Sequence, residues 1–322
     1  MKQEHPEKSI KEAIQHLTEH GSKLTKPDAS GKSALHIDGE HAGYVSAKDG
    51  VHVAHHSSGD TVHKSKKEAV QALTDKHFQE LTKQVDHAAT EKRIAAIEKK
   101  HGPVPEFKDS KQAEAWLKEK HPNVGVSLEG MHESHLRVNA AQFHALASEH
   151  KWAMNPLALQ TGTFRDPNPL VPESHAPSAV ALKRGATTYI VMNTHRYGKP
   201  IEELHSALKE EKHTGFGAAD HPESVLTHEF GHAAHYTIRD AAEQHRAKKI
   251  LAEWEKATFG NKKDRASQYA RTNTEEGWAE SFAQMHHTPK SEWAPSTHRV
   301  AALVEHFKAN DPYHKESWSK LP

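Results

Sequence analysis

The sequence predicts an α+β protein in which a small α/β module and a long helix precede a larger, mostly helical domain. Short β-prone runs alternate with tight-turn dipeptides over residues 33–60. Apolar residues then recur at helical spacing from about residue 66 to residue 100, and the pattern is helical again from residue 201 almost to the end. The 322 residues suffice for two domains with hydrophobic cores. We therefore expect one domain over residues 1–100 and a second over residues 108–322.

The N-terminal module is expected to contain a three-stranded meander. Its strands are the β-prone runs Leu35–Ile37, Tyr44–Ser46 and Val51–Ala54. Asp38-Gly39 and Asp49-Gly50 separate these runs, and such dipeptides favour tight turns between paired strands.

The long helix follows the meander. Its apolar side chains form a rough stripe, made of Val70, Leu73, Leu81, Val85, Ile94 and Ile97. Gly102 and Pro103 are expected to end the helix, because glycine suits the residue after a helix and proline cannot continue one. The segment HGPVPEFKDS at 101–110 is therefore the best candidate for a domain boundary.

Two segments of the N-terminal domain are similar to each other. KSIKEAIQHLTE at 8–19 and KSKKEAVQALTD at 64–75 share eight of twelve positions. Both contain the Ser-x-x-Glu spacing of a helix capping box, at Ser9/Glu12 and Ser65/Glu68. Two interpretations stay open, a duplicated module or two similar helix starts in a chain rich in Lys, Glu and Ala.

The second domain is expected to begin with alternating short elements. Two segments have helical periodicity, DSKQAEAWLKEKH at 109–121 and AAQFHALASEH at 140–150. Three segments are expected to be strands, GVSLEG at 125–130, HLRVNA at 135–140 and TTYIVMN at 187–193. Residues 155–186 are rich in proline and are expected to be irregular.

The composition narrows the classes of function. Lys plus Arg and Asp plus Glu number 43 each, so the formal net charge is zero and nothing predicts binding to nucleic acid or to an anionic membrane. No apolar run approaches the roughly 20 residues that span a bilayer, and the first residues lack the apolar region of a Sec-type signal. We expect a soluble protein.

Histidine is abundant and cysteine is absent. Without cysteine any metal must be held by His, Asp or Glu, since thiolate ligands are missing. The 31 histidines have two open interpretations, as ordinary solvated polar residues or as groups that respond to pH near neutrality.

The segment SVLTHEFGHAAHY contains the spacing His-Glu-x-x-His. Residues four apart share one face of a helix, so His228 and His232 can present two imidazoles to one metal ion. Glu229 can then take a proton from water at that ion. Asp220 is expected to cap this helix and Pro222 to lie in its first turn. Roughly 0.3 accidental matches are expected in a chain this rich in His and Glu, so a third ligand decides the question.

The metzincin pattern is excluded as the source of that ligand. It requires Gly three residues and His six residues after the second histidine, where this chain has His235 and Ile238. His235 is expected to be a polar flank of the helix. The segment NTEEGWAESFAQMHH instead offers Glu276 and Glu280, four apart on one helical face. One can bind zinc while the other accepts a hydrogen bond from a ligand histidine.

HEFGH followed some forty residues later by EEGWAESFA is similar to the gluzincin zinc metallopeptidases. The similarity is to catalytic domains of the anthrax lethal factor type and to zincin-like domains of phage structural and toxin-related proteins. It covers residues 222–290 specifically and residues 185–315 more loosely. The resemblance implies a zincin-like domain, mainly helical with a small mixed sheet, in which TTYIVMN is the edge strand that flanks the substrate.

The resemblance also implies a role for each site residue. The zinc ligands would be His228, His232 and Glu276, and Glu229 would be the general base. Glu280 would support a ligand from behind, and Tyr269 would stabilise the oxyanion. Glu275 introduces a one-residue ambiguity, which the Glu280 spacing resolves in favour of Glu276. Tyr236 and His213 are weaker candidates for contact with the transition state.

We therefore expect a zinc-dependent endopeptidase whose partner is a protein or peptide substrate, without nucleic acid or membrane. One alternative is a structural or virion-associated protein that uses a zincin-like domain for packing or binding within a larger particle. A third hypothesis is a toxin or metal-binding module whose histidine-rich N-terminal part is the working end. Cytoplasmic and virion-associated locations both fit these expectations.

Overall fold

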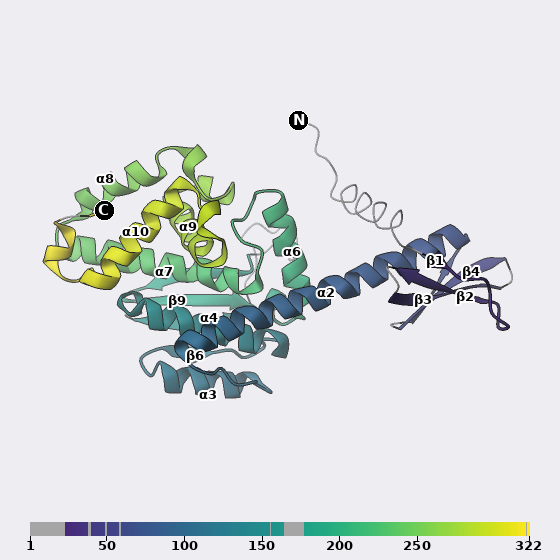
Figure 1. The fold of residues 1–322 in the computed structure, drawn as a ribbon. Helices are drawn as coiled ribbons and strands as arrows, with labels where there is room; N and C mark the ends of the chain where they lie inside the picture. Colours follow the sequence, from purple (N-terminus) through teal and green to yellow (C-terminus); the bar gives the residue numbers. More distant parts are fainter. Residues whose placement is uncertain are drawn as a thin grey trace. The chain divides into compact units, whose positions relative to one another are not determined.

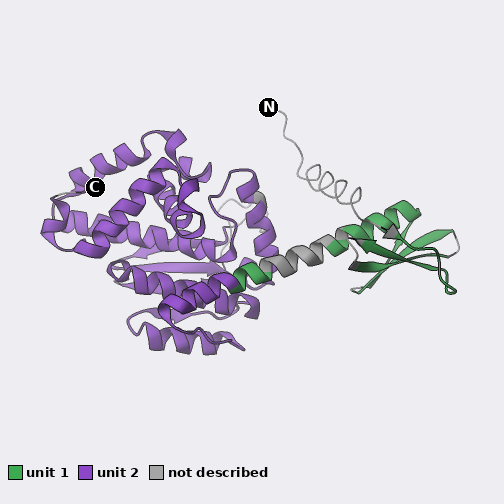
Figure 2. Cartoon of the chain, in the orientation of Figure 1, with its two compact units in different colours: residues 1–91 green, residues 92–322 purple. Residues whose placement is uncertain are grey.

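The computed structural model describes residues 23–37, 40–48, 50–57, 59–154, 156–163, 177–319 and 321–322. The described chain mixes helices with two sheets, so the predicted α+β class is confirmed (Figure 1). It divides into two compact units, residues 1–91 and 92–322 (Figure 2). The division falls inside the long helix α2 (Lys66–His101). No helix of the described chain is long and apolar enough to cross a bilayer.

The first unit contains a five-stranded antiparallel sheet in the order β1-β2-β3-β4-β5. Its strands are β1 (Lys23–Leu24), β2 (Lys32–Ile37), β3 (Glu40–Lys48), β4 (Val51–His56) and β5 (Gly59–His63). The predicted meander is confirmed as β2, β3 and β4, and one further strand lies on each side of it. The expected turn residues Asp38, Gly39 and Asp49 lie outside the described residues.

The start of α2 packs on this sheet. Leu35, Val45 and Ala54 from the strands join Ala69 and Leu73 from the helix in one buried cluster. These strand residues alternate with solvated ones, as expected for a sheet covered on one face.

Local hydrogen bonds fix both ends of α2. Glu68 N–H donates to Ser65 Oγ at 3.2 Å, which confirms the predicted cap at that position. Gly102 has a φ of +94° and its N–H donates to Glu98 O at 2.9 Å, so the predicted helix end is also confirmed. The other predicted capping pair, Ser9/Glu12, lies outside the described residues.

The apolar side chains of α2 pack in two different hydrophobic clusters, one in each unit. Leu73 belongs to the core of the first unit, whereas Ile94 packs with Val104, Val138 and Ala141 in the second. The side chains of Leu81 and Val85, between these two contacts, lie outside the described residues.

The second unit contains a four-stranded mixed sheet in the order β6-β7-β9-β8. Its strands are β6 (Gly125–Ser127), β7 (Leu157–Gly162), β8 (Ala179–Arg184) and β9 (Thr187–Asn193). β6, β7 and β9 are parallel, and β8 is antiparallel to β9. The predicted strand TTYIVMN is confirmed as β9, but it pairs on both sides, so the expectation that it is the edge strand is wrong. Its near-continuous apolar run is typical of a strand buried on both faces, and the edge strand beside it is β8.

Two local expectations for this unit are wrong. Residues 155–186, expected to be irregular, contain β7 and β8. Residues 135–140, expected to be a strand, lie in helix α4 (Glu133–Glu149), most of which is buried. A short alternation such as His-Leu-Arg-Val fits either element, because a buried helix is apolar on several faces.

Helices make up the rest of the second unit. Those described are α3 (Ser110–Lys120), α4, α5 (Thr194–Tyr197), α6 (Ile201–His213), α7 (Pro222–Gln244), α8 (Lys248–Phe259), α9 (Thr274–His287) and α10 (Pro295–Asn310). Single 3₁₀ turns lie at Lys151–Ala153, Lys262–Asp264, Tyr269–Arg271, Lys290–Glu292 and Lys315–Trp318. The helices predicted at 109–121, at 140–150 and beyond residue 201 are confirmed.

Helix α7 lies at the centre of this unit. It packs against β8, β9 and α4 on one side and against α9 on the other (Figure 1). Leu226, Phe230 and Ile238 are fully buried along it. Gly231 marks the crossing with α9, because a Cβ atom there would lie 3.0 Å from Phe282 Cβ and 3.1 Å from Ala279 Cα. The two helices that carry the candidate site therefore cross in close contact.

Candidate metal centre

Helix α7 carries the His-Glu-x-x-His segment. Pro222 is its first residue, as predicted, and His221 precedes it without a capping hydrogen bond from its side chain. The prediction that Asp220 caps this helix is wrong. Its carboxylate lies 3.3 Å from Lys212 Nζ instead. Burial on several sides, rather than a capping side chain, holds this helix in place.

Three predicted ligand atoms converge between α7 and α9. His228 Nε2 and His232 Nε2 are 3.2 Å apart. Glu276 Oε2 lies 3.2 Å from the first and 3.4 Å from the second. Ligands about 2.0–2.1 Å from a tetrahedral zinc ion are about 3.3 Å from one another. The three atoms could therefore hold a metal ion without rearrangement.

Glu276 Oε2 supports this interpretation independently. The atom is buried and has no hydrogen bond of acceptable geometry, although two ring nitrogens lie close to it. Burying an unpaired carboxylate oxygen is costly. Burial works to raise the pKa of Glu276, but His228 and His232 outweigh it and hold the pKa well below its usual range. The carboxylate is therefore ionised, as a metal ligand must be.

The start of α9 positions this carboxylate. Asn273 Oδ1 accepts the Glu276 N–H at 2.8 Å, which caps the helix one turn before the ligand. Gly277 follows, and a Cβ atom there would lie 2.9 Å from Phe259 Cδ1 and 3.3 Å from Ala270 O. Glycine thus allows α9 to approach the preceding segment closely.

Glu280 lies behind the first histidine. Its Oε1 is 2.9 Å from His228 Nδ1, and its Oε2 accepts the Ala218 N–H at 2.7 Å. A carboxylate at Nδ1 favours the tautomer with the proton on that nitrogen. In the neutral form that binds a metal ion, the lone pair of His228 Nε2 would face His232 and Glu276.

Glu229 is buried beside the two histidines. Burial raises its pKa, while the charges of His228 and His232 act in the opposite direction. The backbone of Ala181 in β8 lowers the pKa of Glu229 slightly, as the histidine charges do. The net shift of the pKa is upward, toward the range in which a general base is most effective.

Two tyrosines flank the ligand histidines. Tyr269 stacks on His228 with ring centroids 5.9 Å apart and an interplanar angle of 27°. Burial raises its pKa, and the charge of Glu276 raises it further, so the phenol stays protonated and can donate. Tyr236 stacks on His232 with centroids 6.3 Å apart. His213, the last residue of α6, is exposed and is not one of the three residues whose donor atoms converge.

Two neighbouring candidates have other partners. His235 Nε2 is 2.7 Å from Glu255 Oε1, and its ring stacks on Trp278 at 5.1 Å. Glu275 forms an exposed ion pair with Arg239. Neither belongs to the converging group, so the structure brings together His228, His232 and Glu276 and leaves His235 and Glu275 apart.

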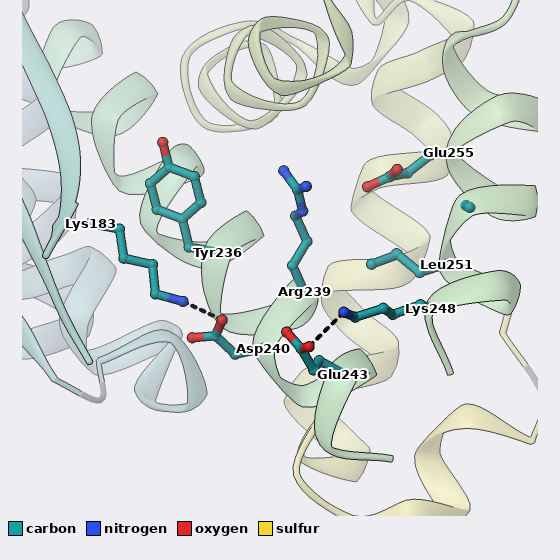
Figure 3. Close-up of a pocket in the computed structure, with 9 residues that line it drawn as sticks. Lys183, Tyr236, Arg239, Asp240, Glu243, Lys248, Leu251 and Glu255 are labelled. Carbon is teal, nitrogen blue, oxygen red and sulfur yellow. Dashed lines mark hydrogen bonds and ion pairs between the residues drawn. The ribbon is translucent and has the colours of Figure 1, made fainter. Parts of the chain in front are cut away.

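A pocket of about 460 Å³ lies along α7 on the C-terminal side of the site (Figure 3). Tyr236 lines it from α7, Leu251 from α8 and Lys183 from the edge strand β8. Its charged groups are paired, Lys183 with Asp240 and Lys248 with Glu243 (Figure 3). Sequence reasoning missed this pocket, the Ala218 amide and the edge strand. All of them depend on contacts between distant segments, which no local spacing indicates.

The chain matches no protein-family model and no curated protein sequence. The functional conclusion therefore depends on the geometry of the site.

Proposed function

We propose that the second unit is a zinc-dependent endopeptidase of the gluzincin type with a zincin-like fold. One observation carries this proposal. His228, His232 and Glu276 point three donor atoms at a common centre with the spacing of a tetrahedral zinc site. The buried carboxylate of Glu229 lies on the same helix between the two histidines.

The donor set suits zinc in particular. Two imidazoles and one carboxylate are the protein ligands of catalytic zinc sites in peptidases, and a fourth position stays open for water. Zinc, when bound there, supplies a Lewis acid that polarises the scissile carbonyl and lowers the pKa of water toward 7.

Glu229 moves the protons of the reaction. Its carboxylate accepts a proton from the attacking water as the water oxygen bonds to the carbonyl carbon. It later donates that proton to the leaving nitrogen as the C–N bond breaks. Burial raises the pKa of Glu229, which favours its uptake of the proton from water.

Tyr269 donates to the developing oxyanion. Its ring is fixed against His228, and its protonated hydroxyl group is close enough to Glu276 to feel that charge. A donor fixed beforehand where negative charge develops stabilises the transition state without reorganisation. Tyr236, stacked on His232, is the second candidate for this role.

The substrate is an extended segment of a protein or peptide. β8 pairs with β9 along one edge, and no other described strand pairs with it. A peptide could add to the edge of β8 that no described strand covers, by main-chain hydrogen bonds. The pocket lined by Tyr236 and Lys183 would then receive one of its side chains.

The test is cleavage of a degenerate peptide library followed by mass spectrometry. Wild-type protein should cleave peptides, a chelator should abolish cleavage, and added zinc should restore it. Glu276→Ala should stay inactive at the same zinc concentration. Absence of cleavage by zinc-loaded, folded wild type would overturn the proposal and favour the structural or virion-associated alternative.

A further inference from the structure

A second group of metal-ligating side chains lies at the other end of α9. Glu149 and His150 are at the C-terminal end of α4, and His286 is in the last turn of α9. One donor atom from each lies within 4.8 Å of the other two. Glu276 precedes His286 by ten residues on α9, roughly 15 Å at 1.5 Å per residue. This group is therefore separate from the candidate peptidase site.

The two histidines repeat the arrangement of the first site. His150 Nε2 and His286 Nε2 are 3.2 Å apart, and their rings are 5.2 Å apart at 80°. The rings of His228 and His232 are 4.9 Å apart at 78°, with the same 3.2 Å between their Nε2 atoms. Both nitrogen pairs match the separation of about 3.3 Å between two ligands of a tetrahedral zinc ion.

His150 is held rigidly in an apolar environment. It is fully buried, and its ring packs against Phe282 at 5.1 Å and Phe230 at 5.9 Å. Its Nδ1 has no hydrogen-bond partner, and its Nε2 points at His286. The backbone N–H of His150 donates to Leu146 O at 2.8 Å, which fixes the ring at the end of α4. Nε2 is therefore the atom of His150 that a metal ion beside His286 could bind.

Glu149 supplies the carboxylate. Its Oε1 accepts hydrogen bonds from His101 Nε2 at 2.9 Å and Lys100 Nζ at 2.8 Å. Such bonds orient a ligating carboxylate from behind. Lys308 Nζ lies 4.0 Å from Oε2 and also pairs with Glu305. The two lysines compete with a cation for this carboxylate, but the Lys100 side chain is 64% exposed and can turn to solvent.

We propose that Glu149, His150 and His286 bind a second zinc ion, which joins the end of α4 to the end of α9. Two imidazoles and one carboxylate suit zinc among the common divalent ions, and a water molecule completes four-fold coordination. This ion has a structural role, because it ties the ends of two helices together. The proposal uses none of the peptidase ligands and does not depend on the proposed function.

Zinc analysis by mass spectrometry tests the second site directly. Samples are saturated with zinc and dialysed against zinc-free buffer before analysis. We expect about two zinc ions per wild-type chain and about one in each of the single variants Glu276→Ala and His286→Ala. The double variant Glu276→Ala/His286→Ala should bind none. His150→Phe, which keeps an aromatic ring in the buried position, should also lose one equivalent. His298→Ala removes an exposed histidine and should lose none.

The outcomes separate the two sites. A second site that holds zinc raises the melting temperature of Glu276→Ala when zinc is added, and the double variant shows no such shift. The second-site proposal is overturned if Glu276→Ala retains no zinc, or if His286→Ala and His150→Phe retain as much as wild type. If His286→Ala lost one zinc ion per chain and Glu276→Ala lost none, the second site would be supported. The same result would contradict the zinc site of the proposed peptidase. Equal loss in His298→Ala would indicate adventitious binding and overturn the second site.

Discussion

Glu280 connects the segment before α7 to the ligand face of α7 through His228. Its Oε1 lies 2.9 Å from His228 Nδ1, and its Oε2 accepts the Ala218 N–H at 2.7 Å. Two hydrogen bonds thus fix the carboxylate, and the carboxylate fixes the tautomer and angle of the imidazole. Much of the proposed zinc affinity depends on this contact, although Glu280 itself does not touch the metal.

Replacing Glu280 tests that dependence. Glu280→Gln should weaken zinc binding at the first site by about 10–100-fold, because the amide no longer favours a proton on His228 Nδ1. Competition with a zinc-binding dye measures the affinity, and the His286→Ala background removes the second site from the titration. The matched control is Glu275→Gln, which alters an exposed carboxylate on the same helix. Equal affinities in the two variants would show that the contact does not support the metal.

The two flanking tyrosines can be distinguished by kinetics. Tyr269→Phe should lower kcat by about 10²–10³-fold with little change in KM, because the lost donor acts mainly in the transition state. Tyr236→Phe is the matched control and should reduce kcat much less. Zinc content should be unchanged in both variants. A larger loss in Tyr236→Phe would transfer the role of oxyanion donor to that residue.

The close crossing of α7 and α9 predicts an effect on stability. Alanine is the better helix former, yet Gly231→Ala should lower the free energy of unfolding by about 1–3 kcal/mol. The added methyl group meets the backbone of Ala279 and the side chain of Phe282, and the backbone cannot easily move. Urea denaturation measures the change. The double variant Gly231→Ala/Phe282→Leu should lose less than the sum of its two single variants. A more stable Gly231→Ala would contradict the proposed packing.

Buried histidines predict a loss of stability in mild acid. His135 is fully buried on α4, and its Nε2 is 3.1 Å from Lys199 O. Burial lowers its pKa from 6.5 to about 4. Above pH 6.5 the residue is neutral in both states. As the pH falls from about 6.5 toward 4, the unfolded chain binds a proton that the folded chain does not, so folding loses about 3 kcal/mol.

Replacing His135 isolates this contribution. The free energy of unfolding is measured at pH 7 and at pH 4.5 in the presence of a chelator. Its decrease between the two pH values should be about 2–3 kcal/mol smaller in His135→Gln than in wild type. The control His298→Gln, at an exposed histidine, should keep the wild-type difference. The same pH dependence in all three proteins would show that His135 is not held neutral.

The sequence indicated the candidate site better than it indicated the fold around it. His228 and His232, like Glu276 and Glu280, are four residues apart on helices, and that spacing alone places each pair on one face. Spacing alone does not show that the two faces meet, which was an expectation from the proposed resemblance to gluzincins. Helical spacing also favours Glu276 over Glu275, because only Glu276 shares a face with Glu280, and it is Glu276 that lies beside the two histidines in the structure.

The missed features depend on distant contacts. β7 and β8 lie in a proline-rich region, and their pairing with β9 is not encoded in local periodicity. The amide of Ala218 contributes to the site through the backbone, so no side-chain motif could reveal it. His150 and His286 are 136 residues apart, and neither belongs to a recognisable spacing. Helical spacing predicts which residues share a face, whereas packing decides which faces meet.

The central claim is that Glu229 acts as a base beside a zinc ion held by His228, His232 and Glu276. Glu229→Gln tests it most directly, with zinc content and peptide cleavage measured on the same sample. The variant should bind as much zinc as wild type, because Glu229 is not a ligand, and its cleavage rate should fall by at least about 10²–10⁴-fold. Cleavage at the wild-type rate in the zinc-loaded variant would contradict the assignment of Glu229 as the base.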